Sequence, residues 1–242
     1  HHKDFEAYSL RADNTDSSKI HGYYSLGTNA VAVAQVDSLA AAPASQPERA
    51  DAGTSSDKPR SFVIPDDFRG SIETSRTLHE AAHQLAFNSG IQKRGVPYPL
   101  WLSEGLAMQF EPDAAGTVAL GRDNPDRRVG LLMMRMRGRL IPLADLVARP
   151  EYSPALGRSE REVYAQSWGL FQFLFRTRPG QLKAYLQAMA RLPAGRASTQ
   201  TLHAIFVNSF GPLPALEADW AKFLASLPTD TTGCTRPSKP RN

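Results

Sequence analysis

Apolar residues recur at three- and four-residue steps through most of the chain after Ser71, in stretches separated by Pro and Gly. This is the period of an amphipathic α-helix, because 3.6 residues per turn bring such positions to one face. Helices are therefore predicted over 71–88, 97–110, 131–137, 143–148, 160–176, 182–191, 199–208 and 213–227. The pattern predicts a C-terminal half that is entirely helical.

Strand patterns are confined to the first part of the chain. Residues 22–36 alternate apolar and β-branched positions around a Gly-containing turn, which predicts a short hairpin or edge strand, and 61–64 predicts another strand. Residues 38–60 are rich in Ala, Ser, Pro and charge without an apolar period, so a mobile loop is expected there. We expect one mainly helical α+β domain over 1–228, followed by a flexible tail over 229–242.

Composition narrows the possible partners and cofactors. The single cysteine, Cys234, excludes an intramolecular disulfide framework and a cysteine-rich zinc module, so any metal must be held by His and carboxylates. The net charge of +4 is small for 242 residues, and the basic stretch from Arg122 to Arg139 is expected to be a solvated helix face. Neither a nucleic-acid partner nor a membrane span is expected.

A five-residue motif, His79-Glu80-Ala81-Ala82-His83, lies inside the best-patterned predicted helix. The two histidines are one turn apart on one face, where both imidazoles can reach a single cation. Glu80 projects about 100° further round the helix. From there its carboxylate can lie beside a metal-bound water and act as the general base. The structural alternative is a solvated helix face with no metal.

Glu104, in the next predicted helix, supplies a third candidate ligand. A catalytic zinc takes three protein ligands and leaves one position open, and two His with one Glu is an established set. Gly90 and the prolines Pro97 and Pro99 allow the chain to turn back between the two helices. Leu102, Leu106 and Phe110 would bury the opposite stripe of the second helix. One Zn²⁺ per chain, bound by His79, His83 and Glu104, is therefore predicted.

The stretch TLHEAAHQLAFNSG followed by VPYPLWLSEGLAMQFE resembles the gluzincin zinc metallopeptidases, and in particular the peptidase-MA-like bacterial domains of unassigned function. The resemblance is strongest over 22–111 and weaker to about Leu174. It implies zinc on His79, His83 and Glu104 with Glu80 as base. It also implies a zincin-like core of the thermolysin type, with a small sheet packed on the motif helix. It does not carry over a substrate.

Tyr164 begins the stretch YAQSWGL, which resembles the segment in which aminopeptidase-type gluzincins place an oxyanion-binding tyrosine. A tyrosine hydroxyl can donate a hydrogen bond while remaining protonated at neutral pH. The alternative is a tyrosine whose ring lies in the core and whose hydroxyl bonds to the backbone. Tyr152 is a second candidate. Glu73, Asn88 and Ser103 are considered as partners of the ligating imidazoles, since such ligands usually bond through their other ring nitrogen.

The predicted function is hydrolysis of peptide bonds by a metal-activated water, with a peptide or protein as the substrate. A substrate strand is expected to add beside 29–36. The alternatives are a non-catalytic zincin-like binding module and a hydrolase of a non-peptide amide or a cell-wall peptide. The resemblance implies an exported bacterial protein, periplasmic or secreted, although the chain begins at His1 and shows no leader.

Overall fold

Helices make up most of the protein, as the apolar period predicts. The structure is a computed structural model that describes residues 2–14, 16, 22–34, 62–63, 72–112, 117–118 and 120–230. The α-helices are α1 (His2–Asp13), α2 (Ile72–Asn88), α3 (Leu100–Ala107), α4 (Pro125–Met136), α5 (Leu143–Val147), α6 (Glu160–Thr177), α7 (Pro179–Ala190), α8 (Thr199–Phe210) and α9 (Leu213–Ser226). Short 3-10 turns lie at Met108–Phe110 and Pro154–Leu156.

Two small antiparallel sheets accompany the helices. One pairs β1 (Gly22–Ser25) with β2 (Ala30–Val33), and the other pairs β3 (Phe62–Val63) with β4 (Thr117–Val118). The predicted hairpin over 22–36 is confirmed as far as residue 34, with Asn29 in the left-handed region at φ 57° in its turn. The mainly helical α+β class is thus observed. The predicted loop over 38–60 and most of the tail lie outside the described residues.

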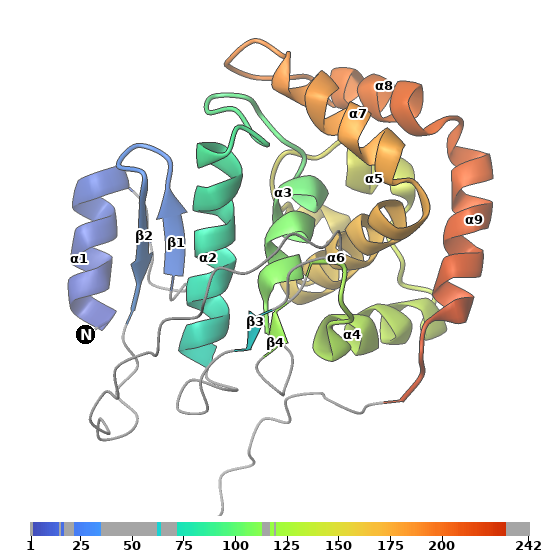
Figure 1. Ribbon diagram of the computed structural model, residues 1–242, viewed down its shortest axis with the longest axis horizontal. Coiled ribbons are helices and arrows are strands. Elements are labelled where there is room, and N and C mark those ends of the chain that lie inside the picture. Colours follow the sequence, from blue (N-terminus) through green and yellow to red (C-terminus); the bar gives the residue numbers. More distant parts are fainter. Residues whose placement is uncertain are drawn as a thin grey trace, which may run out of the picture.

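The hairpin and the helical half lie on opposite sides of α2. Figure 1 shows β1 and β2 between α1 and α2, with α3 and α6 on the other side of α2. Helix α6 contacts α3, α4, α7 and α9, so it is the central helix of this half. In the part of the chain that the structure describes, no helix combines the length and the apolar character that crossing a membrane requires.

The core lies among α3 and the helices around α6. Its fully buried large side chains include Trp101, Leu102, Met108, Leu131, Trp168, Phe173, Tyr185 and Phe206. The predicted apolar stripe of the second helix is confirmed at Leu102 and Leu106, which are buried. Because that stripe fixes α3 against the core, the opposite face of the helix carries Glu104 toward α2.

Two sequence predictions are corrected by the structure. Leu78, Ala82, Leu85 and Ala86 recur at helical steps and predict one apolar stripe on the motif helix; Ala82 and Ala86 are buried as expected, but Leu85 is 57% exposed. Helix α4 begins at Pro125 and not near Leu131, since the Asn124 side chain caps it by accepting a hydrogen bond from the Arg127 backbone N–H. Neither α1 nor β4 was predicted from the sequence.

Candidate metal centre

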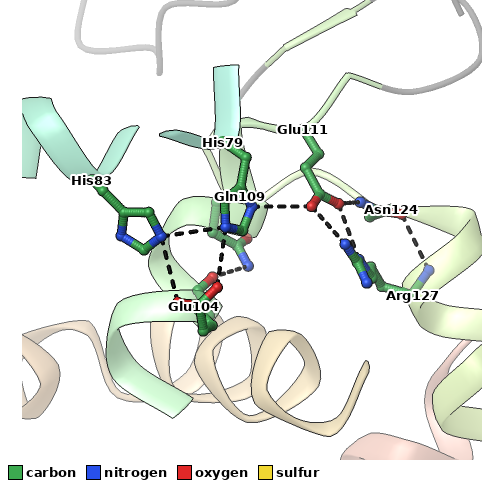
Figure 2. A network of polar contacts seen from close by, with 8 residues as sticks. His79, His83, Glu104, Gln109, Glu111, Asn124 and Arg127 are labelled. Atoms are coloured by element: carbon green, nitrogen blue, oxygen red, sulfur yellow. Dashed lines mark hydrogen bonds and ion pairs between the residues drawn. The ribbon is translucent and has the colours of Figure 1, made fainter. Parts of the chain in front are cut away.

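The two histidines of the motif converge with Glu104 as predicted. His79 Nε2 lies 3.0 Å from Glu104 Oε2 and 3.3 Å from His83 Nε2, and His83 Nε2 lies 3.5 Å from Glu104 Oε1. Figure 2 shows the two imidazoles and the carboxylate directed at one point, from α2 and α3. All three side chains are largely buried, with 11 to 14% of each exposed. The triad therefore joins two helices at one polar centre.

These distances fit a metal ion. Two ligands about 2.1 Å from a tetrahedral zinc ion stand about 3.4 Å apart. The two Nε2 atoms are 3.3 Å apart, and each lies 3.0 to 3.5 Å from one of the two oxygens of Glu104. One ligand atom from each of His79, His83 and Glu104 lies within 4.8 Å of the other two. Two imidazole nitrogens and a carboxylate oxygen are also the donors that such an ion accepts. The three side chains could therefore hold a metal ion.

A second carboxylate, that of Glu111, contacts the other ring nitrogen of the candidate ligand His79. Its Oε1 lies 3.1 Å from His79 Nδ1, so the Nδ1–H can donate to it while Nε2 keeps a lone pair for a cation. Glu111 is in turn bound by Arg127, whose Nε and Nη2 donate over 3.0 and 2.7 Å, and by the Asn124 amide over 2.9 Å. Figure 2 shows Glu111 between His79 and Arg127.

The charges around His79 hold it in a definite protonation state. Burial lowers its pKa, but the hydrogen bonds with Glu104 and Glu111 outweigh burial and raise the pKa to about 10. For the Glu111 carboxyl, burial acts in the other direction and raises the pKa. The Arg127 charge and the hydrogen bond from His79 outweigh burial and lower this pKa to about 2. The pKa of Glu104 is held below its usual range by His79 and His83, against the effect of burial. In the metal-free centre these contacts favour the protonated form of His79, between two carboxylates.

Glu80 lies beside the hairpin. Its carboxylate accepts a hydrogen bond from the Tyr24 backbone N–H, and a Cβ placed on Gly22 would lie 3.6 Å from Glu80 Cγ. Burial raises the pKa of Glu80, while the imidazoles of His79 and His83 act in the opposite direction without cancelling it. A carboxylate with a raised pKa next to a candidate metal centre is suited to accept a proton and to return it.

Tyr164 lies within electrostatic reach of the centre from α6. Burial is the main cause that raises the pKa of its hydroxyl, and the negative charges of Glu104 and Glu80 add to it. The hydroxyl remains protonated at neutral pH and donates a hydrogen bond to Glu160. By contrast, the Tyr152 hydroxyl donates to the Arg158 carbonyl oxygen over 2.9 Å, which is the backbone-bonded arrangement.

Two of the residues considered as imidazole partners serve other purposes. Ser103 accepts a hydrogen bond from Gln92, and Asn88 accepts one from Arg94. The side chain of Glu73 lies outside the described residues. The partner found, Glu111, directly follows the 3-10 turn Met108–Phe110 in extended backbone, outside the helix that carries Glu104. Helical spacing from Glu104 therefore does not predict it.

The basic stretch is not a uniformly solvated face. Arg135 and Arg137 are exposed as expected, but Arg128 is only 2% exposed and binds Asp123 and the segment after α9. Arg127 lies at the metal centre. Both departures follow from the earlier start of α4, which brings these two arginines into its first turn. The loop before α4 is held by Gln172, whose amide donates to the Gly121 carbonyl oxygen over 2.7 Å.

The fold and the site together define a mainly helical α+β protein with a candidate metal centre of two histidines and one glutamate. Residues 73–194 match the model of a family described as a protein of unknown function, DUF1570, and the chain belongs to this family. The matched range includes every residue of the centre, from His79 to Tyr164. The chain matches no curated protein and no solved structure.

Proposed function

We propose that this protein is a zinc-dependent peptidase of the gluzincin type, with a zincin-like core. The observation that carries the proposal is the convergence of His79, His83 and Glu104 from two helices at the separations of a tetrahedral ligand set. The motif places Glu80 on the same helix as both imidazoles, and its carboxylate lies against the β1 backbone. A metal bound here would polarise a scissile carbonyl and lower the pKa of a water molecule.

The chain's own residues divide the remaining work. Glu80 takes the proton of the attacking water and passes it to the leaving amine, which its raised pKa favours. Glu111 keeps the His79 ring oriented with Nε2 toward the ion. Tyr164 donates to the carbonyl oxygen as that oxygen gains charge, which requires its single O–H to turn from Glu160 to the substrate.

The position of the substrate is inferred from the hairpin. The sequence predicted that a peptide strand adds beside 29–36, but the backbone that reaches Glu80 belongs to β1 at Tyr24. In the antiparallel pair with β2, Tyr24 lies opposite Val31. We therefore place the substrate along the β1 side of the hairpin, where an extended peptide meets the general base. Export from the bacterial cell remains a prediction from the resemblance.

Zinc content and hydrolysis test this function together. The purified protein is expected to hold about one zinc ion per chain, removable with a chelator. Glu80→Gln should retain the zinc and lose cleavage of a mixed peptide library, whereas His79→Ala should lose both. A protein that holds zinc but cleaves neither peptides nor muropeptides would be a binding module. Cleavage of muropeptides alone would indicate a cell-wall substrate, and absence of bound metal contradicts the proposal.

A further inference from the structure

Glu111 uses only some of the hydrogen-bond donors that Arg127 offers at the candidate metal centre. A guanidinium carries five N–H groups. Glu111 accepts one from Nε over 3.0 Å and one from Nη2 over 2.7 Å. Among the described residues, no acceptor lies against Nη1, and the side chain is 23% exposed. Three N–H groups, two on Nη1 and one on Nη2, are therefore left for a ligand.

The geometry of these free donors matches a carboxylate. One N–H of Nη1 and the remaining N–H of Nη2 point in parallel from the end of the planar group, the arrangement that binds two carboxylate oxygens at once. Glu111 binds the adjacent edge of the guanidinium, through Nε and Nη2. The ligand would therefore meet donors that are already oriented, which reduces the entropy lost on binding.

The location of Arg127 fixes which part of a substrate it can reach. The Glu111 carboxylate stands between the guanidinium and the His79 ring, so Arg127 does not reach the carbonyl under attack (Figure 2). Its charge also interacts with Tyr164 and Glu104, so it lies within electrostatic reach of the same centre. An extended peptide advances roughly 3.5 Å per residue. Since Nη2 of Arg127 is linked to Nδ1 of His79 through one Glu111 oxygen, over 2.7 and 3.1 Å, a group one or two residues from the scissile bond is the part of a substrate that could reach the guanidinium.

The surrounding charges permit an anionic group. Arg127 offsets Glu111 through their ion pair. A divalent ion on the triad would offset the negative charges of Glu80 and Glu104. The Glu160 carboxylate accepts a hydrogen bond from the Tyr164 hydroxyl. Selection of a substrate with an anionic group therefore depends on short-range pairing of that group with the Arg127 guanidinium, and not on a strongly positive field around the centre.

We propose that Arg127 binds a carboxylate of the substrate one or two residues from the scissile bond, and so selects peptides that carry one there. This inference rests on the proposed peptidase function. The carboxylate has two possible sources, the C-terminus of the peptide and an acidic side chain. A free C-terminus makes the protein a carboxypeptidase or a dipeptidyl carboxypeptidase, whereas an acidic side chain makes it an endopeptidase with an acidic preference.

The test begins with the wild-type, zinc-loaded protein and paired peptide libraries. One pair differs only in a free or amidated C-terminus, and the other exchanges Asp and Glu for Asn and Gln. Cleavage is followed by mass spectrometry. The carboxylate member of one pair should be cleaved about tenfold faster in kcat/KM, the expected worth of a charged hydrogen-bonded pair. Which pair shows the preference identifies the source of the carboxylate.

Arg127→Lys separates recognition from support of Glu111. Lysine keeps a positive charge opposite Glu111 but lacks the planar fork. The preference for the carboxylate peptide over the amide peptide should fall about tenfold, in addition to any loss of rate that both peptides share through Glu111. If Arg127 only supports Glu111, both peptides lose rate equally and the preference is unchanged. Arg139→Lys is the matched control, because Arg139 makes the same kind of fork to Glu162 and lies outside the metal centre.

Binding provides a readout that does not depend on turnover. Zinc-loaded Glu80→Gln protein is titrated with the best-cleaved peptide and its uncharged counterpart, and the carboxylate form should bind about tenfold more tightly. Peptides cleaved and bound without any carboxylate preference overturn this inference and leave the peptidase proposal standing. Absence of all cleavage and binding overturns both. If Arg127→Lys fails to fold, the comparison of carboxylate and uncharged peptides with the wild-type protein still tests whether a carboxylate is preferred.

Discussion

Glu111 Oε1 lies 3.1 Å from His79 Nδ1, and the same carboxylate is held by two nitrogens of Arg127. His79, a candidate ligand on α2, is thus oriented by Glu111, which follows α3. Glu111 is in turn held by Arg127, in the first turn of α4. The centre depends on α2, on α3 with the turn that follows it, and on the start of α4. Loss of any of these contacts is expected to affect metal binding.

Glu111→Gln is expected to weaken zinc binding about 10- to 100-fold, because the amide is a poorer acceptor for the His79 Nδ1–H and leaves Arg127 without its ion pair. Competition with a chelator of known affinity measures the effect. Glu162→Gln serves as the control, since Glu162 pairs with Arg139 in the same way without contacting the centre. Equal zinc affinities in the two variants would refute the role of Glu111.

Gly105→Ala is expected to displace Glu104, its neighbour in the chain. A Cβ on Gly105 would lie 2.7 Å from the Ser167 carbonyl oxygen and 2.8 Å from Phe171 Cβ, so α3 would have to move away from α6. The free energy of unfolding should fall by about 1–3 kcal/mol, as for other overpacked sites, and zinc content should fall with it. Denaturant titration and elemental analysis measure the two effects.

Gly180→Ala is the matched control for that substitution. Gly180 lies in α7, and a Cβ there would have no atom within 4 Å apart from its chain neighbours and the nearby backbone of its own helix. The free energy of unfolding should rise by about 0.4–1 kcal/mol, since alanine restricts the unfolded chain, with zinc content unchanged. A Gly105→Ala protein that behaves like this control would show that α3 and α6 tolerate the extra methyl group.

The metal-free protein should lose stability as the pH rises from about 6.5 to 10. The folded-state pKa of His79 is raised from 6.5 to about 10, because hydrogen bonds with Glu104 and Glu111 outweigh burial. Its stabilising contribution is therefore complete below pH 6.5 and lost as the folded protein gives up the proton. Thermal unfolding with a chelator present measures the trend, and His79→Gln should flatten it. A chelated wild-type protein whose Tm is constant over this range contradicts the expectation.

Zinc binding should release about one proton per ion at pH 8, because the imidazole of His79 must lose its proton before Nε2 can bind a metal. Calorimetry in buffers with different ionisation enthalpies measures that number. The same titration below pH 6.5 should show a weaker apparent affinity. Zinc uptake without proton release would mean that His79 is already neutral in the metal-free protein.

Tyr164→Phe is expected to lower kcat about 100-fold, the usual cost of removing one oxyanion donor, while zinc content stays near one per chain. The substitution removes only the hydroxyl that donates to Glu160, so the ring still packs against the core. Tyr152→Phe is the control, because that hydroxyl is bonded to the Arg158 carbonyl oxygen. An unchanged kcat for Tyr164→Phe would assign the tyrosine a structural role only.

Much of the fold followed from local patterns. The predicted end of the first long helix at residue 88 is confirmed, and Gly90, expected to let the chain turn back, has a left-handed φ of 78°. The hairpin turn was predicted from Gly27 and Asn29. Helix α1 and the start of α4 were missed because the first has little apolar period and the second depends on the Asn124 cap followed by Pro125. At the start of α4 the cap residue and the proline decided the outcome, and an apolar period does not detect such residues.

The sequence alone determined the three candidate ligands and the candidate base. His79 and His83 are four residues apart on one helix, so the backbone geometry itself places them together, and the chemistry of zinc then indicated Glu104. Only the tertiary structure decided that Glu111, Asn124 and Arg127 join this centre. They lie on segments whose distance from α2 depends on how α3, α4 and α6 pack, and close packing of helices is not encoded in the spacing of any one segment.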